Sequence, residues 1–251
     1  MSFTGGDSVV VVVATDDAAA TEAVNEKQYF TRDLSLDNCL AAAADTATVV
    51  DLTVDQRFIG DVGCVVWDAA LVLAKYLDRQ SSRLGLRRPA LVVELGAGTG
   101  FCGLCAAALG ARAVITDLAD CVDLMVRNVN KNRLLIGDRV AVHEYDWAQT
   151  AGGDQQLADE QLFFGHNITE INYILISDCL YYAQSVRQLY DTVDWLSSKG
   201  ATVLMSYEDR DDKRPLVDKF FKLIKSKFIV NEISSDELHA DYRSPDLHLY
   251  N

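Results

Sequence analysis

Short apolar runs and longer amphipathic stretches alternate along residues 90–227 of this 251-residue chain. The short runs are rich in valine, isoleucine and leucine and have the length of buried strands, whereas the longer stretches repeat apolar residues at helical spacing. Strands are expected at residues 90–95, 113–117, 140–145, 173–178 and 202–207. Helices are expected at residues 101–109, 121–134, 183–198 and 213–227. This alternation is typical of a parallel sheet covered by helices on both faces.

The alternation ends after residue 227. Residues 228–233 and 247–250 are both strand-like, and no helical pattern separates them. Two strands joined without a crossover helix pair antiparallel. The sequence therefore predicts an α/β fold with a seven-stranded, mostly parallel, doubly wound (Rossmann-like) sheet whose last strand is antiparallel.

The first 80 residues have a different organisation. Residues 1–27 are acidic and alanine-rich without a periodic pattern, so we expect an N-terminal extension there and one folded domain at residues 28–251. Short alternating pieces such as residues 48–54 predict a small β extension ahead of the main sheet. Residues 65–77 have the pattern of an amphipathic helix.

The charge balance restricts the partners of the protein. The chain carries 23 basic and 37 acidic residues, which gives a formal net charge of −14. Such a protein repels a nucleic acid backbone, so a basic protein segment is the more natural substrate. The apolar run at residues 9–14 is too short to span a membrane and lacks the basic leader of a signal peptide. We expect a cytoplasmic monomer, with the nucleus as a further compartment.

Cysteine usage gives no sign of a metal site. The six cysteines lie in apolar segments of a chain without an export signal, so we expect reduced thiols. Cys102 and Cys105 form a C-x-x-C pair, for which zinc or redox chemistry is the alternative to packing in the core. Because no second pair follows and the four histidines have no ligand spacing, core packing is favoured.

A glycine-rich turn follows the first strand of the main sheet. Residues 94–100 read Glu-Leu-Gly-Ala-Gly-Thr-Gly, and Asp117 ends the next strand. Glycines there let the backbone turn sharply and approach a ligand, and an acid at the second strand can hold both hydroxyls of a ribose. G-x-G-x-G after Glu-Leu is typical of S-adenosylmethionine enzymes, whereas Gly98, Gly100 and Gly103 also satisfy the G-x-G-x-x-G pattern of NAD-dependent oxidoreductases. The glycines alone do not decide.

Ligands bind beyond the carboxyl ends of the strands in such a sheet. The candidates for cofactor binding at those ends are Glu94, Gly96, Gly98, Asp117, Trp147 and Ser177. Asp178 and Tyr181 are the candidates for catalysis, and a helix N-cap is the alternative role for Asp178. Trp67 either lines the channel or packs in the core. Glu208 and Asp209, after the fifth strand, would attract a basic substrate.

Four motifs together resemble a known family. They are Gly-Cys-Val-Val-Trp-Asp-Ala-Ala at residues 63–70, the glycine-rich turn, Asp-Cys-Leu-Tyr-Tyr at residues 178–182 and Tyr-Glu-Asp-Arg at residues 207–210. The chain resembles the seven-strand (class I) protein lysine methyltransferases with a D-x-x-Y motif. The antiparallel strand pair agrees with this family, since ordinary dinucleotide-binding folds lack it. Within the family, the motifs are most similar to those of the branch that methylates valosin-containing protein, a hexameric AAA ATPase.

The resemblance implies a function and a set of contacts. It implies S-adenosylmethionine as the cofactor and a protein lysine as the acceptor, in valosin-containing protein or a similar chaperone-type protein. The implied cofactor contacts are Trp67, Gly96, Ala97, Gly98, Asp117, Trp147 and Ser177, the last in place of the usual alanine. Asp178 and Tyr181 take the D-x-x-Y roles. The alternatives are the NAD-dependent oxidoreductase and a methyltransferase-like binding module without activity.

Overall fold

A six-stranded sheet forms the centre of the protein in this computed structural model, which describes residues 29–40, 49–58, 60, 62–88, 90–151 and 162–251. The strand order is β10-β9-β8-β3-β4-β5. The strands are β3 (Leu91–Leu95), β4 (Arg112–Asp117), β5 (Val140–Glu144), β8 (Ile171–Ser177), β9 (Thr202–Glu208) and β10 (Leu247–Tyr250). Neighbours pair in parallel except β10, which pairs antiparallel with β9. The predicted α/β class, with its antiparallel last strand, is confirmed.

The strand predicted at residues 228–233 is reduced to a single bridge. Glu232 pairs antiparallel with Tyr250, and the flanking backbone of Asn231 and Ile233 bonds to Asn251 and Leu249. The segment lies beside β10 in the seventh position of the sheet. Its pairing stays short because it has a strand on one side only and Ile229 is 87% exposed, so little burial supports an extended run.

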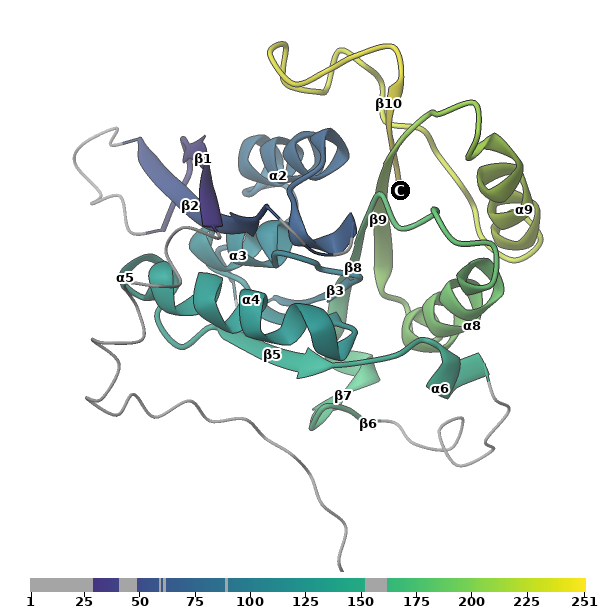
Figure 1. The fold of residues 1–251 in the computed structure, drawn as a ribbon, viewed down its shortest axis with the longest axis horizontal. Coiled ribbons are helices and arrows are strands. Elements are labelled where there is room, and N and C mark those ends of the chain that lie inside the picture. Colours follow the sequence, from purple (N-terminus) through teal and green to yellow (C-terminus); the bar gives the residue numbers. More distant parts are fainter. Residues whose placement is uncertain (1–28, 41–48, 59, 61, 89, 152–161) are drawn as a thin grey trace, which may run out of the picture.

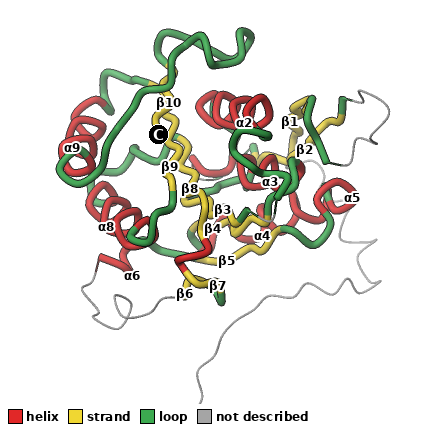
Figure 2. Tube along the Cα trace, turned by 180° about the vertical axis from the view of Figure 1, so that it is seen from behind, coloured by secondary structure: helices red, strands yellow, loops and turns green. Residues whose placement is uncertain are grey.

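Helices cover both faces of the sheet (Figure 1). One face carries α2 (Asp68–Gln80), α3 (Phe101–Ala108) and α4 (Ala119–Lys131), followed by the single turn α5 (Arg133–Ile136); the other carries α8 (Ser185–Ser197) and α9 (Arg214–Ile224). The same two groups of helices flank the column of strands when the molecule is seen from behind (Figure 2). Each face has its own hydrophobic core, and β3, buried along its whole length, separates the two.

Two helix predictions are wrong at their ends. The helix expected at residues 65–77 begins only at Asp68, because Trp67 has an extended backbone conformation. The helix expected at residues 121–134 begins at Ala119 and is interrupted at Asn132, which leaves the helical region and bonds to β2 instead. Smaller elements complete the described chain: the 3-10 turns η2 (Val62–Cys64) and η3 (Ile168–Glu170), the helical turn α6 (Ala148–Ala151), and the short strands β6 (Leu162–Phe163) and β7 (His166–Asn167).

The predicted β extension is a hairpin of β1 (Tyr29–Leu36) and β2 (Val50–Arg57), paired antiparallel over eight residues. Its apolar side chains are buried in the core that α3 and α4 share. The predicted extension at residues 1–27 lies outside the described residues. Within the described chain, no helix has both the length and the apolar character needed to cross a membrane.

Asn128 of α4 joins the hairpin to the glycine-rich turn. Its Oδ1 accepts from the Asp55 N–H at 2.7 Å, and its Nδ2 donates to the Asp55 carbonyl at 3.0 Å and to the Thr99 carbonyl at 2.9 Å. The side chain is fully buried, so no water replaces these partners.

We expect Asn128→Leu to lower the free energy of unfolding by about 3 kcal/mol, because it leaves one N–H and two carbonyls buried without partners. Asn130→Leu, on the exposed side of the same helix, is the matched control and should change stability by less than about 0.5 kcal/mol. Denaturant unfolding of both variants measures the difference. Equal effects would show that the Asn128 bonds do not hold the hairpin.

Candidate functional site

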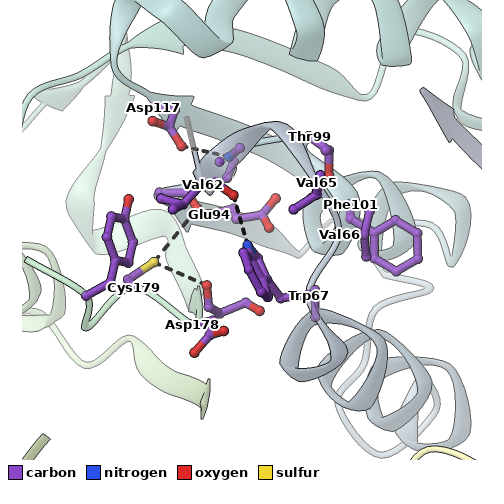
Figure 3. Close-up of a pocket in the computed structure, with 17 residues that line it drawn as sticks. Val62, Val65, Val66, Trp67, Glu94, Thr99, Phe101, Asp117, Asp178 and Cys179 are labelled. Carbon is purple, nitrogen blue, oxygen red and sulfur yellow. Dashed lines mark hydrogen bonds between the residues drawn. The ribbon is translucent and has the colours of Figure 1, made fainter. Parts of the chain in front are cut away.

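The predicted site residues meet at the carboxyl ends of β3, β4 and β8, around a pocket that we call the glycine-loop pocket (Figure 3). A second pocket, the tyrosine pocket, adjoins it and shares Gly63, Gly96, Asp117 and Tyr181 with it. Of the predicted residues, the glycine-loop pocket is lined by Trp67, Glu94, Gly96, Ala97, Gly98, Asp117, Ser177, Asp178 and Tyr181. Trp147 lines the tyrosine pocket. The structure therefore brings all ten predicted residues together around two adjoining pockets.

Gly98 requires the absence of a side chain. Its φ is +53°, and a Cβ atom there would lie 2.3 Å from the carbonyl oxygen of Gly63. On the other side, the Gly98 N–H donates to Oδ2 of Asp117 at 2.7 Å. The turn is thus held between the η2 segment and the end of β4, with its backbone facing the pocket.

Asp117 lies at the end of β4 and lines the glycine-loop pocket, the position expected of a ribose-binding acid. Besides Gly98, it accepts from the Leu118 N–H through Oδ1 at 2.7 Å, and the Cys121 thiol also bonds to it. These bonds fix the orientation of the Asp117 carboxylate at the wall of the pocket. Leu118, which follows at once and is half exposed, lines the tyrosine pocket and offers an apolar contact beside it.

Glu94 faces the start of α3 as well as the pocket. Oε2 accepts from the Gly103 N–H at 2.8 Å and Oε1 from the Cys102 N–H at 3.3 Å, so the carboxyl caps the helix from inside the core. Burial raises the pKa of Glu94 to about 8, and the two N–H bonds only partly offset this. Gly103 itself is required by packing, because a Cβ there would lie 2.2 Å from Cγ2 of Ile115.

Ser177 carries a hydroxyl that the described protein leaves unsatisfied. Its Oγ is buried and has no hydrogen-bond partner among the described residues, although the residue lines the glycine-loop pocket. A buried polar atom without a partner costs free energy, so a polar ligand group in the pocket would be stabilised by it. This hydroxyl, the open backbone at Gly98 and the orientation of Asp117 together fit a nucleoside cofactor that also carries polar groups.

Both tryptophans lie at the cavity. Trp67 is 39% exposed and lines the pocket, so its alternative role as a core residue is wrong. Its Nε1 donates to the Val62 carbonyl at 2.9 Å, which fixes the indole at the mouth. Trp147 is half buried, and its ring lies so close to Gly96 that a Cβ there would be 3.0 Å from Cζ2.

Asp178 is not a helix cap. α8 begins at Ser185 with Gln184 as its N-cap residue, and the Asp178 carboxylate instead receives both ends of the Arg210 guanidinium, at 3.2 Å (Oδ1) and 2.7 Å (Oδ2). The backbone of Asp178 has a φ of +54°, which is strained for a residue with a side chain but is tolerated by aspartate. Tyr181 lines both pockets, and its ring packs edge-on against Tyr182 at 4.6 Å.

Several further residues line the pocket that the sequence analysis does not single out. The glycine-loop pocket is also lined by Val62, Gly63, Val65, Val66, Ala70, Thr99, Phe101 and Cys179. All of them stand inside the quoted motifs or directly beside them, but nothing in the motifs singles them out as lining residues. Glu208 and Asp209, expected to attract a basic substrate, are each paired with a nearby arginine, Glu208 with Arg210 and Asp209 with Arg214.

The C-x-x-C prediction of core packing is confirmed, since Cys102 and Cys105 are buried and donate to carbonyls of α2. Among the described residues, no group of three metal-ligand side chains is found.

Comparisons with known proteins give a consistent result. The model of a lysine methyltransferase family matches residues 47–227. Protein N-lysine methyltransferase METTL21A of Mus musculus is 30% identical over 202 residues, covering 80% of this chain and 81% of the relative. The same enzyme of Danio rerio is 29% identical, with 80% and 81% covered. METTL21E of Mus musculus is 28% identical, with 69% and 66% covered. Among solved structures, an O-methyltransferase from Bacillus cereus in complex with SAH matches with a TM-score of 0.45 at 14% identity, covering 70% of this chain and 78% of that one.

The family match decides between the two interpretations of the glycine-rich turn. A lysine methyltransferase uses S-adenosylmethionine as its methyl donor, so the nicotinamide interpretation is not supported. The third glycine of that alternative pattern, Gly103, has its own explanation in the contact between α3 and β4.

We expect Gly98→Ala to weaken the binding of S-adenosylhomocysteine more than tenfold, because the added Cβ must push the turn away from Gly63. Gly85→Ala is a matched control, since Gly85 also has a positive φ but nothing within 4 Å of its Cβ position. Both variants should lose about 1–2 kcal/mol of stability from the backbone strain, and only Gly98→Ala should lose affinity in calorimetric titration. Unchanged affinity in Gly98→Ala would contradict the assignment of the turn as the cofactor cradle.

The pKa of Glu94 predicts a pH-dependent stability. Because the folded-state pKa lies near 8 and the reference value is 4.5, the folded protein binds one more proton than the unfolded chain between these pH values. The stabilisation is therefore fully present below pH 4.5 and is lost as pH rises toward 8, with a slope of at most about 1.4 kcal/mol per pH unit.

Glu94→Gln should remove this contribution. The unfolding free energy of the wild type relative to Glu94→Gln should fall from pH 5 to pH 8 in denaturant titrations, whereas the exposed Glu144→Gln should run parallel to the wild type. Parallel curves for wild type and Glu94→Gln would show that Glu94 ionises normally in the core.

Proposed function

The chain belongs to the lysine methyltransferase family and is a protein N-lysine methyltransferase, and on that premise we propose that it methylates a lysine of valosin-containing protein or of a related chaperone-type ATPase. We further propose that it acts in the cytoplasm as a monomer, with Asp178 and Tyr181 receiving the lysine. The observation that carries this proposal is the meeting of the glycine-rich turn, the Asp178 carboxylate and the rings of Trp67 and Tyr181 in one pocket.

The pocket suits a side chain with an apolar stem and a nitrogen at its tip. Trp67 comes from the segment before α2, and Asp178 and Tyr181 come from the segment after β8, so different elements bring the rings and the carboxylate to the lining of the same pocket. Aromatic rings pack favourably along a methylene chain and attract a cation. A carboxylate oxygen accepts a hydrogen bond from an amine in either protonation state.

The reaction requires a neutral amine. A lysine with a pKa near 10.4 is almost wholly protonated at neutral pH, and removing its proton at that pH costs about 4 kcal/mol. When bound, S-adenosylmethionine supplies a methyl group on a positively charged sulfur. The neutral amine of the substrate would take this methyl group with its lone pair, the electron pair of the C–S bond would remain on sulfur, and the methylated nitrogen would release its extra proton to solvent.

The residues of the chain contribute orientation and a dry environment. Asp178, held in one orientation by Arg210, would accept a hydrogen bond from the nitrogen and direct its lone pair. Trp67 and Tyr181 would exclude water around the stem, which disfavours the charged form of the amine. Alignment of nitrogen, methyl carbon and sulfur would supply the remaining acceleration.

The choice of substrate protein is supported by the resemblance of four motifs to the branch that acts on valosin-containing protein. The net charge of −14 agrees with an acceptor lysine in a basic segment. The names of the METTL21A and METTL21E relatives specify lysine as the methylated residue and no substrate protein.

Purified protein, incubated with labelled methyl donor and valosin-containing protein, should label one lysine that mass spectrometry identifies. We expect Asp178→Asn to reduce the labelling rate about a hundredfold, as loss of alignment does, without loss of S-adenosylhomocysteine binding. Asp211→Asn, an acid of the neighbouring loop whose side chain is 96% exposed, is the matched control and should remain active.

Labelling of a different protein in a lysate, with none in valosin-containing protein, would replace the substrate and leave the enzyme class intact. Full activity of Asp178→Asn would contradict the role given to the carboxylate.

A further inference from the structure

A cation of the protein itself contacts the residues to which the acceptor lysine is assigned. The guanidinium of Arg210, on the segment after β9, spans the Asp178 carboxylate and also donates to Oε2 of Glu208 at 2.5 Å. Its Cζ lies 5.1 Å from the centre of the Trp67 ring, in a cation–π arrangement. Arg210 thus contacts both the acid and the ring to which the acceptor lysine is assigned.

Burial and strand pairing fix the position of Arg210 beside Asp178. The Asp178 side chain is only 8% exposed and that of Arg210 28%, so water screens the pair weakly. β8 and β9 are parallel neighbours with Ser177 opposite Ser206, which brings the segments after the two strands together at one edge. The Asp178 N–H donates to the Ser206 carbonyl, so the backbone is tied at the same point. A bidentate guanidinium fixes the plane of a carboxylate as well as its charge.

The charges at this point decide how the acceptor amine ionises. Asp178 and Glu208 contribute two negative charges and Arg210 one positive charge, which leaves a net charge of −1 in the cluster. The other titratable groups that face Asp178 are Tyr181 and Cys179 from its own segment, and Glu94 and Asp117 on the glycine-loop side of the pocket. A carboxylate within hydrogen-bond distance of an amine stabilises the ammonium form and opposes loss of its proton.

We propose that Arg210 is a positioning residue that acts through Asp178: its guanidinium holds the carboxylate in one plane and offsets part of the negative charge of the cluster, so that the carboxylate orients the lysine nitrogen while stabilising its ammonium form less. This inference rests on the proposed lysine acceptor. It gives the Asp-Arg pair a purpose that the D-x-x-Y motif by itself does not provide.

Arg210→Gln removes the positive charge and leaves two carboxylates beside the acceptor amine. The pKa of a group next to an uncompensated opposite charge shifts by about one unit or more. The acid limb of the kcat–pH profile, which reports ionisation in the enzyme–substrate complex, should therefore move up by about one unit. At pH 7, kcat should fall about tenfold while KM does not rise.

Two further variants separate charge from geometry. Arg210→Lys keeps the positive charge but cannot donate two parallel hydrogen bonds to the Asp178 carboxylate. We therefore expect kcat to fall while the pKa of the acid limb stays nearly unchanged. Glu208→Gln removes a negative charge and should move the limb down, opposite to Arg210→Gln. Arg214→Gln, at the start of α9 and paired with Asp209 and Asp211, is the matched control, and its kcat–pH profile should superimpose on that of the wild type.

Binding provides a readout independent of turnover. The probes are a peptide containing the lysine labelled by the wild type and its norleucine counterpart, titrated with S-adenosylhomocysteine present at pH 6. Arg210→Gln should raise the ratio of lysine to norleucine affinity about tenfold if one unit of pKa is involved. S-adenosylhomocysteine affinity equal to that of the wild type shows that the variant is folded.

The possible failures are distinguishable. A wild type that methylates no lysine would remove the proposed function, and this inference with it. A wild type that methylates, with Arg210→Gln slowed but its acid limb and peptide preference unchanged, would overturn this inference alone. Shifts of the acid limb in the same direction for Arg210→Gln and Glu208→Gln would also overturn it.

Discussion

The hydrogen bond from the Gly98 N–H to Asp117 is the interaction on which the site depends, because it joins the turn after β3 to the end of β4. On the buried side, Glu94 of β3 caps α3 and holds the helix that the turn leads into. The turn is therefore fixed by two carboxylates from adjacent strands, one facing the cavity and one facing the core. The Gly63 carbonyl closes the remaining direction, which is why no side chain fits at Gly98.

The acceptor end of the cavity is organised by a different pair of strands. Asp178 follows β8 and Arg210 follows β9, and the two side chains meet because the strands are parallel neighbours. The cofactor end depends on backbone geometry that any side chain would disturb, whereas the acceptor end depends on a balance of charges. The hairpin β1–β2 contributes from outside the sheet, since Asn128 connects it to the Thr99 carbonyl of the turn.

The sequence predicts the sheet well, because its parallel strands are short apolar runs bounded by turns, and β3 at the centre is buried along its whole length. It predicts the segment 228–233 less well, because an edge segment has partners on one side only and its pairing depends on contacts that the pattern does not encode. The ten predicted site residues line two adjoining pockets because the carboxyl ends of parallel strands meet at one edge. The partners of those residues are harder to predict: that Asp178 binds Arg210 and that Glu94 caps α3 depends on side-chain direction, which spacing along the chain does not determine.

A structure of the protein bound to S-adenosylhomocysteine and a peptide with the acceptor lysine tests the central claim most directly. The account predicts the lysine stem between Trp67 and Tyr181, with its nitrogen within hydrogen-bond distance of the Asp178 carboxylate and Arg210 still paired with that carboxylate. A lysine that enters by another route, or a nitrogen out of reach of Asp178, would contradict it.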